Sequence, residues 1–281
     1  MQSLGFDLGA GVEELLLASD SRLRSGLVWD CGPKLFPLPR TDAAICFAGE
    51  TLFAFPMILQ IHHATAVHYR HLDRRSDINE YKGFLLQVLN QMHGNIVADG
   101  PPLAEVAGER PLFILAGFSW RRADFQIWTL HFDPSINAFT FRPHGDWSGV
   151  EGRRRVAFVG DGVDEAKQRL RDLLRDSGMI TEGGFDFEPF IVLRDMIREG
   201  QYASIGGPPQ LVKLYRHMNT ARFGVFWPNF ANGRPTLLGR AMFEHEKPPI
   251  GFMDPDDFSV HHLEATSSES DENGEPLSLG P

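Results

Sequence analysis

Cysteine is scarce in this chain, and several other features are missing. The 281 residues include two cysteines, Cys31 and Cys46, which allow neither a disulfide framework nor a CxxC metal motif. We therefore expect a reducing, cytoplasmic environment. No apolar run reaches the roughly 18 residues that a membrane span requires. No basic segment followed by a hydrophobic stretch marks the amino terminus as a signal peptide, so the sequence predicts no membrane partner.

Basic residues are also fewer than acidic residues in this chain. Lysine and arginine number 27 against 37 aspartates and glutamates, which gives a formal net charge of −10. Nucleic acid is disfavoured as a partner, because binding to phosphates requires a basic surface. Hydrophobic residues make up 42% of the chain and charged residues 23%, which is typical of a globular protein. A chain of this length can bury a sizeable core without disulfides or metal ions.

The composition changes near residue 264. From Glu264 onward the chain is rich in Ser, Glu, Asp and Gly and contains no aromatic residue. Such a segment buries too little apolar surface to offset the entropy of ordering. We therefore predict one folded domain over 1–263 and a disordered acidic tail over 264–281, with no internal repeat.

Apolar periodicity predicts the order of the structural elements. Runs of strand length are expected at 12–19, 43–49, 111–118, 124–133, 154–160, 210–216 and 221–227, and helices at 51–69, after Ser76 or Asp77, from Val163 and at about 187–199. Pro56 predicts that the regular part of the first helix begins near it, since proline is tolerated only in a first turn. Runs of strands separated from runs of helices favour two packed sheets with helices outside.

Six short motifs, taken in order, resemble the proteasome β-subunits and their bacterial peptidase relative, which are N-terminal-nucleophile hydrolases. They are LLLASDSRLRSG (15–26), PKLFPL (33–38), ICFAGE (45–50), LFILAGF (112–118), VAFVGDGVDEAKQRL (156–170) and SIGGPPQLVKL (204–214). The resemblance implies an α+β fold of the four-layer αββα sandwich type. It also implies peptide or amide hydrolysis, no cofactor and no metal, and assembly into a homo-oligomer or ring.

The resemblance also implies a set of catalytic residues. In the family, an N-terminal Thr, Ser or Cys attacks a carbonyl while its own α-amine, whose pKa lies near neutrality, acts as the base. Lys34 matches the lysine that tunes this amine, and Asp20 matches the aspartate that holds the lysine. Gly49 matches the glycine whose backbone N–H stabilises the oxyanion. Ser3 is the nearest residue that could serve as the nucleophile.

The amino terminus departs from the family pattern. The spacing to Asp20 places the nucleophile at Leu4, which has no reactive group. Ser3 is preceded by Met1 and Gln2, and a bulky Gln after Met normally blocks simple removal of the methionine. A start site upstream of the written one would restore a nucleophile.

Three supporting positions differ as well. Asp161 stands where the family often carries a serine in a Gly-Ser-Gly turn, and a carboxylate facing the cleft would oppose a developing oxyanion. Tyr202 and Ile205 stand where family members have a supporting Asp and Ser. The catalytic apparatus is therefore incomplete as written.

These departures leave alternative hypotheses open. In the first, a processed chain hydrolyses peptides as a threonine- or serine-type peptidase. In the second, Asp20 and Lys34 form a structural ion pair in a non-catalytic, self-assembling subunit or scaffold of a proteasome-like complex, and the departures favour this role for the pair. In a third, the cleft binds a small molecule or peptide without turnover.

Two further motifs are weighed against simpler explanations. Four histidines cluster near the end of the first predicted helix, and His68 and His71 are spaced to share a helix face and hold a metal. No third ligand follows from the spacing, so we predict surface histidines. Gly160-Asp161-Gly162 resembles a phosphate-binding turn. Because Glu165 replaces the third glycine of GxGxxG, we predict a tight strand-to-helix turn.

Overall fold

The computed structural model describes residues 3–7, 14–24, 26–96, 110–145, 147, 155–177 and 186–263. Helices and strands are both abundant in these ranges, so the chain belongs to the α+β class. The predicted tail over 264–281 lies outside the described residues. Within the described ranges, every helix is too short or too polar to cross a membrane.

The larger sheet is built from both ends of the chain. Its strands are β1 (Ser3–Asp7), β2 (Glu14–Ser19), β10 (Val156–Val159), β11 (Gln210–Tyr215), β12 (Thr220–Trp227), β13 (Arg234–Leu237), β14 (Arg240–Ala241), β15 (Gly251–Met253) and β16 (Val260–His262). The main path runs β10-β1-β2-β11-β12-β13-β14, and β15 joins β12 and β16. Neighbours are antiparallel except β12 and β15. The first strand of the chain is therefore an interior strand of this sheet.

The second sheet follows the chain order. Its strands are β5 (Leu35–Pro37), β6 (Ala43–Ala48), β7 (Leu112–Ser119), β8 (Asp124–Asp133) and β9 (Ala138–Pro143), each antiparallel to the next. A short hairpin of β3 (Leu23–Arg24) and β4 (Val28–Trp29) lies between β2 and β5 in the sequence. The chain therefore passes from one sheet to the other immediately after the polar cluster at the end of β2.

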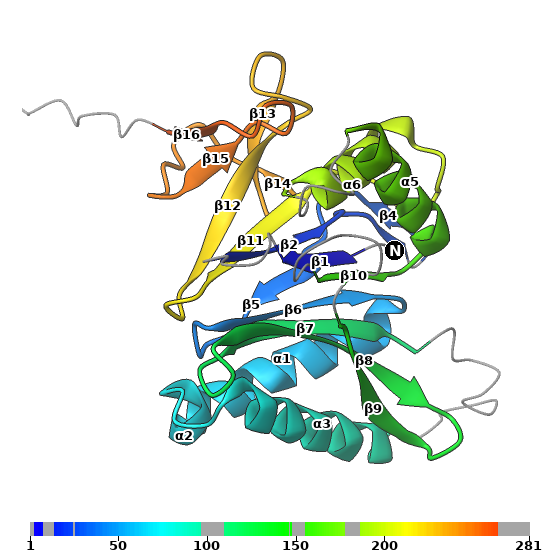
Figure 1. The fold of residues 1–281 in the computed structure, drawn as a ribbon, viewed down its shortest axis with the longest axis vertical. Coiled ribbons are helices and arrows are strands. Elements are labelled where there is room, and N and C mark those ends of the chain that lie inside the picture. The colour runs from blue at the N-terminus through cyan, green and yellow to red at the C-terminus, as the bar shows by residue number, and fades with distance from the viewer. Residues whose placement is uncertain are drawn as a thin grey trace, which may run out of the picture.

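The helices form two groups. They are α1 (Thr51–Val67), α2 (Tyr69–Leu72), α3 (Ile78–Gly94), α5 (Val163–Asp176) and α6 (Glu188–Glu199). Buried side chains of α1 and α3 share an apolar cluster with the second sheet. Those of α5 and α6 share a cluster with the larger sheet. The two groups lie at opposite sides of the molecule (Figure 1).

Strand β2 shows how the sequence pattern produces this packing. Leu15 and Leu17 belong to a cluster that includes Ile114 of the second sheet. Leu16 and Ala18 point the other way and belong to the cluster that contains α5 and α6. Because side chains of a strand alternate between faces, a strand buried on both faces needs a continuous apolar run. The run LLLA meets this requirement.

The predicted elements are confirmed, with one correction at the first helix. Helix α1 begins at Thr51 with Glu50 as its N-cap, so Pro56 lies inside the helix and the expected start near Pro56 is wrong. Proline cannot donate the usual hydrogen bond to the carbonyl four residues earlier, here that of Leu52. Both residues are exposed, so water can hydrate that carbonyl and the helix tolerates the proline.

Candidate functional site

The polar cluster after β2 is centred on Asp20, which is completely buried. Its Oδ1 lies 2.6 Å from Nζ of Lys34, and Lys34 is also completely buried. Its Oδ2 accepts hydrogen bonds from the backbone N–H groups of Arg22 (3.0 Å) and Gly206 (3.1 Å). A buried charge is tolerated when it is paired and hydrogen-bonded in this way. The structure thus brings together the two residues that the resemblance pairs.

Burial governs the protonation of Lys34. Desolvation lowers the pKa of the Lys34 ammonium below its ordinary value. The charge and hydrogen bond of Asp20 oppose this shift, and the charge of Asp161 opposes it further. Lys34 therefore depends on the two carboxylates to remain charged. A positive charge held in this way lowers the pKa of any amine placed beside it.

Gln210, which begins β11, holds the backbone on both sides of this ion pair. Its buried side-chain amide donates to the carbonyls of Asp20 (3.3 Å) and Gly32 (2.8 Å). Its Oε1 accepts from the backbone N–H groups of Lys34 (3.1 Å) and Leu35 (3.3 Å). One side chain thus fixes the segments that carry the carboxylate and the ammonium. The sequence does not predict this role of Gln210, because the role depends on contacts between segments that are distant along the chain.

Arg22 connects the same cluster to two loops. Its guanidinium pairs with both carboxylate oxygens of Asp30 at 2.6 and 2.8 Å and donates to the carbonyl of Ile205 at 3.3 Å. The loop approaches closely enough that a Cβ on Gly206 would meet the Arg22 side chain. A Cβ on Gly207 (φ +72°) would lie 2.3 Å from the carbonyl oxygen of Asp30. Glycine at positions 206 and 207 therefore permits this loop to lie close to Arg22 and Asp30.

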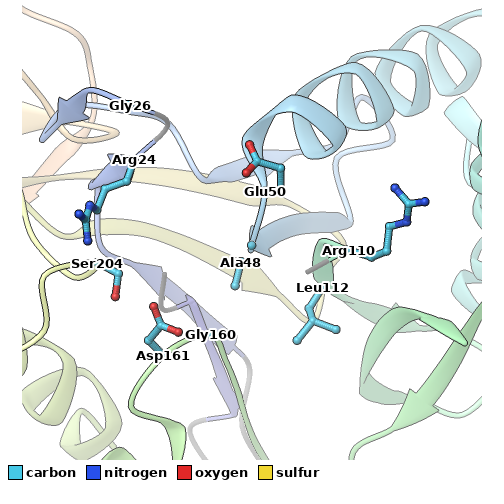
Figure 2. Close-up of a pocket in the computed structure, with 10 residues that line it drawn as sticks. Arg24, Gly26, Ala48, Glu50, Arg110, Leu112, Gly160, Asp161 and Ser204 are labelled. Carbon is cyan, nitrogen blue, oxygen red and sulfur yellow. The ribbon is translucent and has the colours of Figure 1, made fainter. Parts of the chain in front are cut away.

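A cavity of about 460 Å³ lies next to these segments and is lined from both sheets. Gly160 and Asp161 follow β10 of the larger sheet, while Ala48 and Gly49 end β6 and follow it in the second sheet. Ser204 forms part of the wall on the side of Asp161 (Figure 2). The candidate oxyanion donor Gly49 therefore lines an open cavity, where its φ of 107° favours glycine.

Asp161 lies in the predicted strand-to-helix turn and lines the cavity. The turn is tight, since Gly160 and Gly162 both have positive φ values, 108° and 69°. Burial by itself would raise the pKa of Asp161. A hydrogen bond from Ser204 and the charge of Lys34 contribute to a pKa below the ordinary value. The cavity wall thus carries an ionised carboxylate where the resemblance implies a serine.

The role of Ser204 in the site was not predicted from the sequence. It lines the cavity and hydrogen-bonds to Asp161, and Figure 2 shows the two side chains close together on one wall. The resemblance assigns a supporting serine to the next position, which is Ile205. A shift of one residue before the Gly-Gly pair would have identified it.

Ser3 is the first residue of β1, and its backbone register places it at the edge of the site. Its Cα partners are Ser19 in β2 and Val159 in β10. These two residues directly precede Asp20 and Gly160. Strand β1 therefore begins between the two segments that supply the buried ion pair and the Asp161 turn.

The histidine cluster differs from its prediction. Helix α1 ends at Val67, so His68 and His71 do not share one helix, although their ring centroids are 4.4 Å apart. His71 is buried, and its Nδ1 lies 2.6 Å from Oγ of Ser76, so the prediction of a surface residue is wrong here. Burial, with added repulsion from His68, lowers the pKa of His71 to about 4. In the part of the chain that the structure describes, no three histidine, cysteine or acidic side chains are grouped so that they could hold a metal ion.

Comparison with known proteins adds no relative. The chain matches no model of a known protein family and no curated protein. The resemblance to N-terminal-nucleophile hydrolases therefore rests on the motifs of this chain itself.

Proposed function

We propose that this protein is a divergent N-terminal-nucleophile hydrolase with a four-layer αββα sandwich, and that its cavity hydrolyses amide bonds in peptides. The observation that carries the proposal is the register of β1. Its first residue, Ser3, pairs with the residues that precede Asp20 and Gly160. The start of this strand is therefore next to the segments that carry Asp20 and Asp161. The helix groups packed on the two sheets support the same fold.

Each residue has a distinct role in this proposal. A mature chain that begins at Ser3 carries its hydroxyl nucleophile and its α-amine on one residue, which positions the base without loss of entropy. The Lys34 ammonium, held by Asp20, lowers the pKa of that amine so that it can accept the hydroxyl proton. The backbone N–H of Gly49 donates to the oxyanion formed when the hydroxyl attacks the carbonyl.

Asp161 makes this version of the site a weaker catalyst. Its negative charge raises the pKa of a nearby amine, which opposes the lowering of that pKa by Lys34. The same charge repels a developing oxyanion, which opposes the stabilisation by Gly49. Restoring a neutral hydrogen-bonding group by Asp161→Ser therefore raises the turnover of an active enzyme. A decrease would assign Asp161 a supporting role instead.

The deciding experiment is determination of the mature amino terminus. The protein is produced from its native locus with upstream DNA included, and its intact mass and N-terminal peptides are measured. A chain that starts at Ser3, or at an upstream-encoded Thr, Ser or Cys, supports the proposal. Retention of Met1 in the assembled protein excludes it, because no nucleophile then carries a free α-amine.

Peptide hydrolysis is then compared between variants of the processed protein. Ser3→Ala and Lys34→Met are expected to abolish turnover of fluorogenic peptides. The matched control is Lys213→Met, since Lys213 of β11 pairs with Glu14 at 2.8 Å, at the end of β2 opposite to Asp20. Loss of activity in the control as well would indicate a general effect on folding rather than a role for Lys34.

A non-catalytic, self-assembling subunit is the second candidate, and the surface of α1 favours it. This helix contains no acidic or basic residue other than histidine. Leu52, Leu59 and Val67 are 74%, 57% and 83% exposed. In a chain of net charge −10, two copies meet with least repulsion across an uncharged face. Exposed apolar side chains that gather on one uncharged helix indicate an interaction surface, and a second copy of this chain is the proposed cover.

Sedimentation velocity tests this self-association. The wild-type chain is expected to form an oligomer, and Leu59→Glu is expected to weaken it by placing charge on the α1 face. Gln60→Glu, an exposed neighbour on the same helix, adds the same charge at the margin of the face and serves as the control. A monomeric wild-type protein at high concentration would exclude this assembly.

A further inference from the structure

Arg110, just before β7, carries a charge without a counter-ion in the described part of the chain. Its Nη1 is buried and has no hydrogen-bond partner among the described residues. The pKa of Arg110 is lowered by burial, and no acidic group contributes to its shift. A buried cationic donor without an acceptor is costly, so each case calls for a partner.

Aromatic rings hold the guanidinium in place without satisfying its N–H groups. The central carbon of the guanidinium lies 4.5 Å from the ring centre of Phe53 in α1 and 5.6 Å from that of Phe132 in β8. Such contacts favour the cation and fix its plane. The rings offer no lone pair in that plane, so the N–H groups remain available to an acceptor.

A second unsatisfied side chain lies on the same aromatic residue. The ring centroids of His93 and Phe132 are 4.5 Å apart. The Nδ1 atom of His93 is buried and has no partner among the described residues. His93 and Arg110 together line a cavity of about 410 Å³ at the end of α3. We call it the Arg110 cavity.

The other described residues that line the Arg110 cavity are neutral. Asn90 and Asn137 line it beside small and apolar residues, and none of the described lining residues is acidic. Asn90 is held by the backbone of Phe139, whose N–H donates to its Oδ1 at 2.6 Å and whose carbonyl accepts from its Nδ2 at 3.1 Å. This double contact ties α3 to β9 and keeps the cavity walls in a fixed arrangement.

We propose that the Arg110 cavity binds a small oxyanion, a phosphate or a carboxylate, through the guanidinium of Arg110 and the imidazole of His93. A guanidinium offers two parallel N–H groups that match two oxygens of such an anion. An imidazole with its proton on Nδ1 supplies a further donor. Arg110 also lines the first cavity, so the bound anion lies next to the candidate active site. The peptidase proposal requires none of this, and the two are independent.

Calorimetric titration of the full chain tests the proposal. Inorganic phosphate and succinate are titrated separately at constant ionic strength, which distinguishes the two classes of oxyanion. Saturable binding of one of them is expected. Arg110→Met keeps the contact with the aromatic rings but removes the donors, and is expected to weaken binding by about tenfold or more. His93→Phe is expected to weaken it less.

Lys82→Met is the matched control. Lys82 is also a cation over an aromatic ring, with Nζ 3.2 Å from the ring centre of Phe141, but it does not line the Arg110 cavity. This variant is expected to bind the anion as the wild type does. If Arg110→Met does not fold, Arg110→Lys keeps the charge, lacks the planar fork and is expected to bind more weakly. Absence of saturable binding to the wild type, or equal binding by the Arg110 variants, overturns the proposal.

Discussion

Replacing Asp20 by asparagine tests the central contact of this structure. Asp20 and Lys34 are both completely buried and lie 2.6 Å apart. Asp20→Asn keeps the size of the side chain, and its oxygen can still accept from the N–H groups of Arg22 and Gly206. The Lys34 ammonium, however, loses its counter-charge. Removing one partner of a buried ion pair costs about 3–5 kcal/mol, so we expect the free energy of unfolding to fall by this amount at pH 7.

The double variant separates loss of the pair from loss of the charge. Asp20→Asn combined with Lys34→Met replaces two buried charges by neutral groups of similar volume. Such replacements are often close to neutral, so we expect the double variant to lie within about 2 kcal/mol of the wild type. The coupling energy from the double-mutant cycle is then about 3 kcal/mol or more.

Protonation of Lys34 provides a second measure in the same experiment. Burial lowers the pKa of Lys34 in the folded state, and Asp20 opposes this shift. The unfolded chain therefore binds more protons between the folded and unfolded pKa values, and stability rises with pH across that window. Asp20→Asn lowers the folded pKa of Lys34 further, so the rise begins at a lower pH than in the wild type.

Urea-induced unfolding, followed by circular dichroism and tryptophan fluorescence, measures these free energies. Lys213→Met is the control, because the Lys213–Glu14 pair is partly exposed and such pairs contribute about 1 kcal/mol or less. The reasoning is refuted if Asp20→Asn costs less than about 1 kcal/mol. It is also refuted if the two single substitutions are additive within about 0.5 kcal/mol.

Three further predictions concern stability. Burial lowers the pKa of both His71 and His144 to about 4 in the folded protein, whereas the unfolded side chains titrate near 6.5. The free energy of unfolding is therefore expected to fall by up to about 2 kcal/mol for each histidine between pH 7 and pH 5, and His71→Gln is expected to remove its share of this slope in urea titrations. Pro56→Ala restores a helical hydrogen bond in α1 and is expected to stabilise the protein by about 1–3 kcal/mol; no gain in the urea midpoint would contradict this. Gly207→Ala forces a Cβ against the carbonyl of Asp30 and is expected to lower the melting temperature. The control is Gly200→Ala, where the residue also has a positive φ but the added Cβ meets open space, so only the backbone cost of about 1–2 kcal/mol applies. Equal shifts of the melting temperature in the two variants would argue against the close contact at Gly207.

Local patterns in the sequence identified most elements because those elements satisfy local rules. The run LLLA is buried on both faces, as its continuous apolar character predicts. Asp77, one of the two predicted caps, accepts a hydrogen bond from the backbone N–H of Asn79 at the start of α3. These features depend on residues close in sequence. They are therefore visible without the fold.

The predictions that failed depend on which face of an element meets solvent. Pro56 is tolerated inside α1 because the carbonyl it leaves unbonded is on the exposed side. His71 is buried because the short helix α2 turns it toward Ser76 and Phe84. Neither orientation follows from spacing along one helix. Both are set by the packing of neighbouring segments.

The candidate site divides in the same way. Asp20 and Gly49 stand at the ends of predicted strands, which the sequence alone locates, whereas Lys34 is identified only by the resemblance, because no strand is predicted at 35–37. Their joining to Gln210 and Ser204, more than 150 positions along the chain, follows from β2 pairing with β11 in one sheet. By itself the sequence determined the longer apolar strands, the four long helices and the polar residues that follow them, because these depend on local periodicity and turn chemistry. The strands at 3–7, 35–37 and 138–143 were not predicted. Only the tertiary structure decided that Asp20 and Lys34 meet without water, because burial of a charge depends on every segment packed around it.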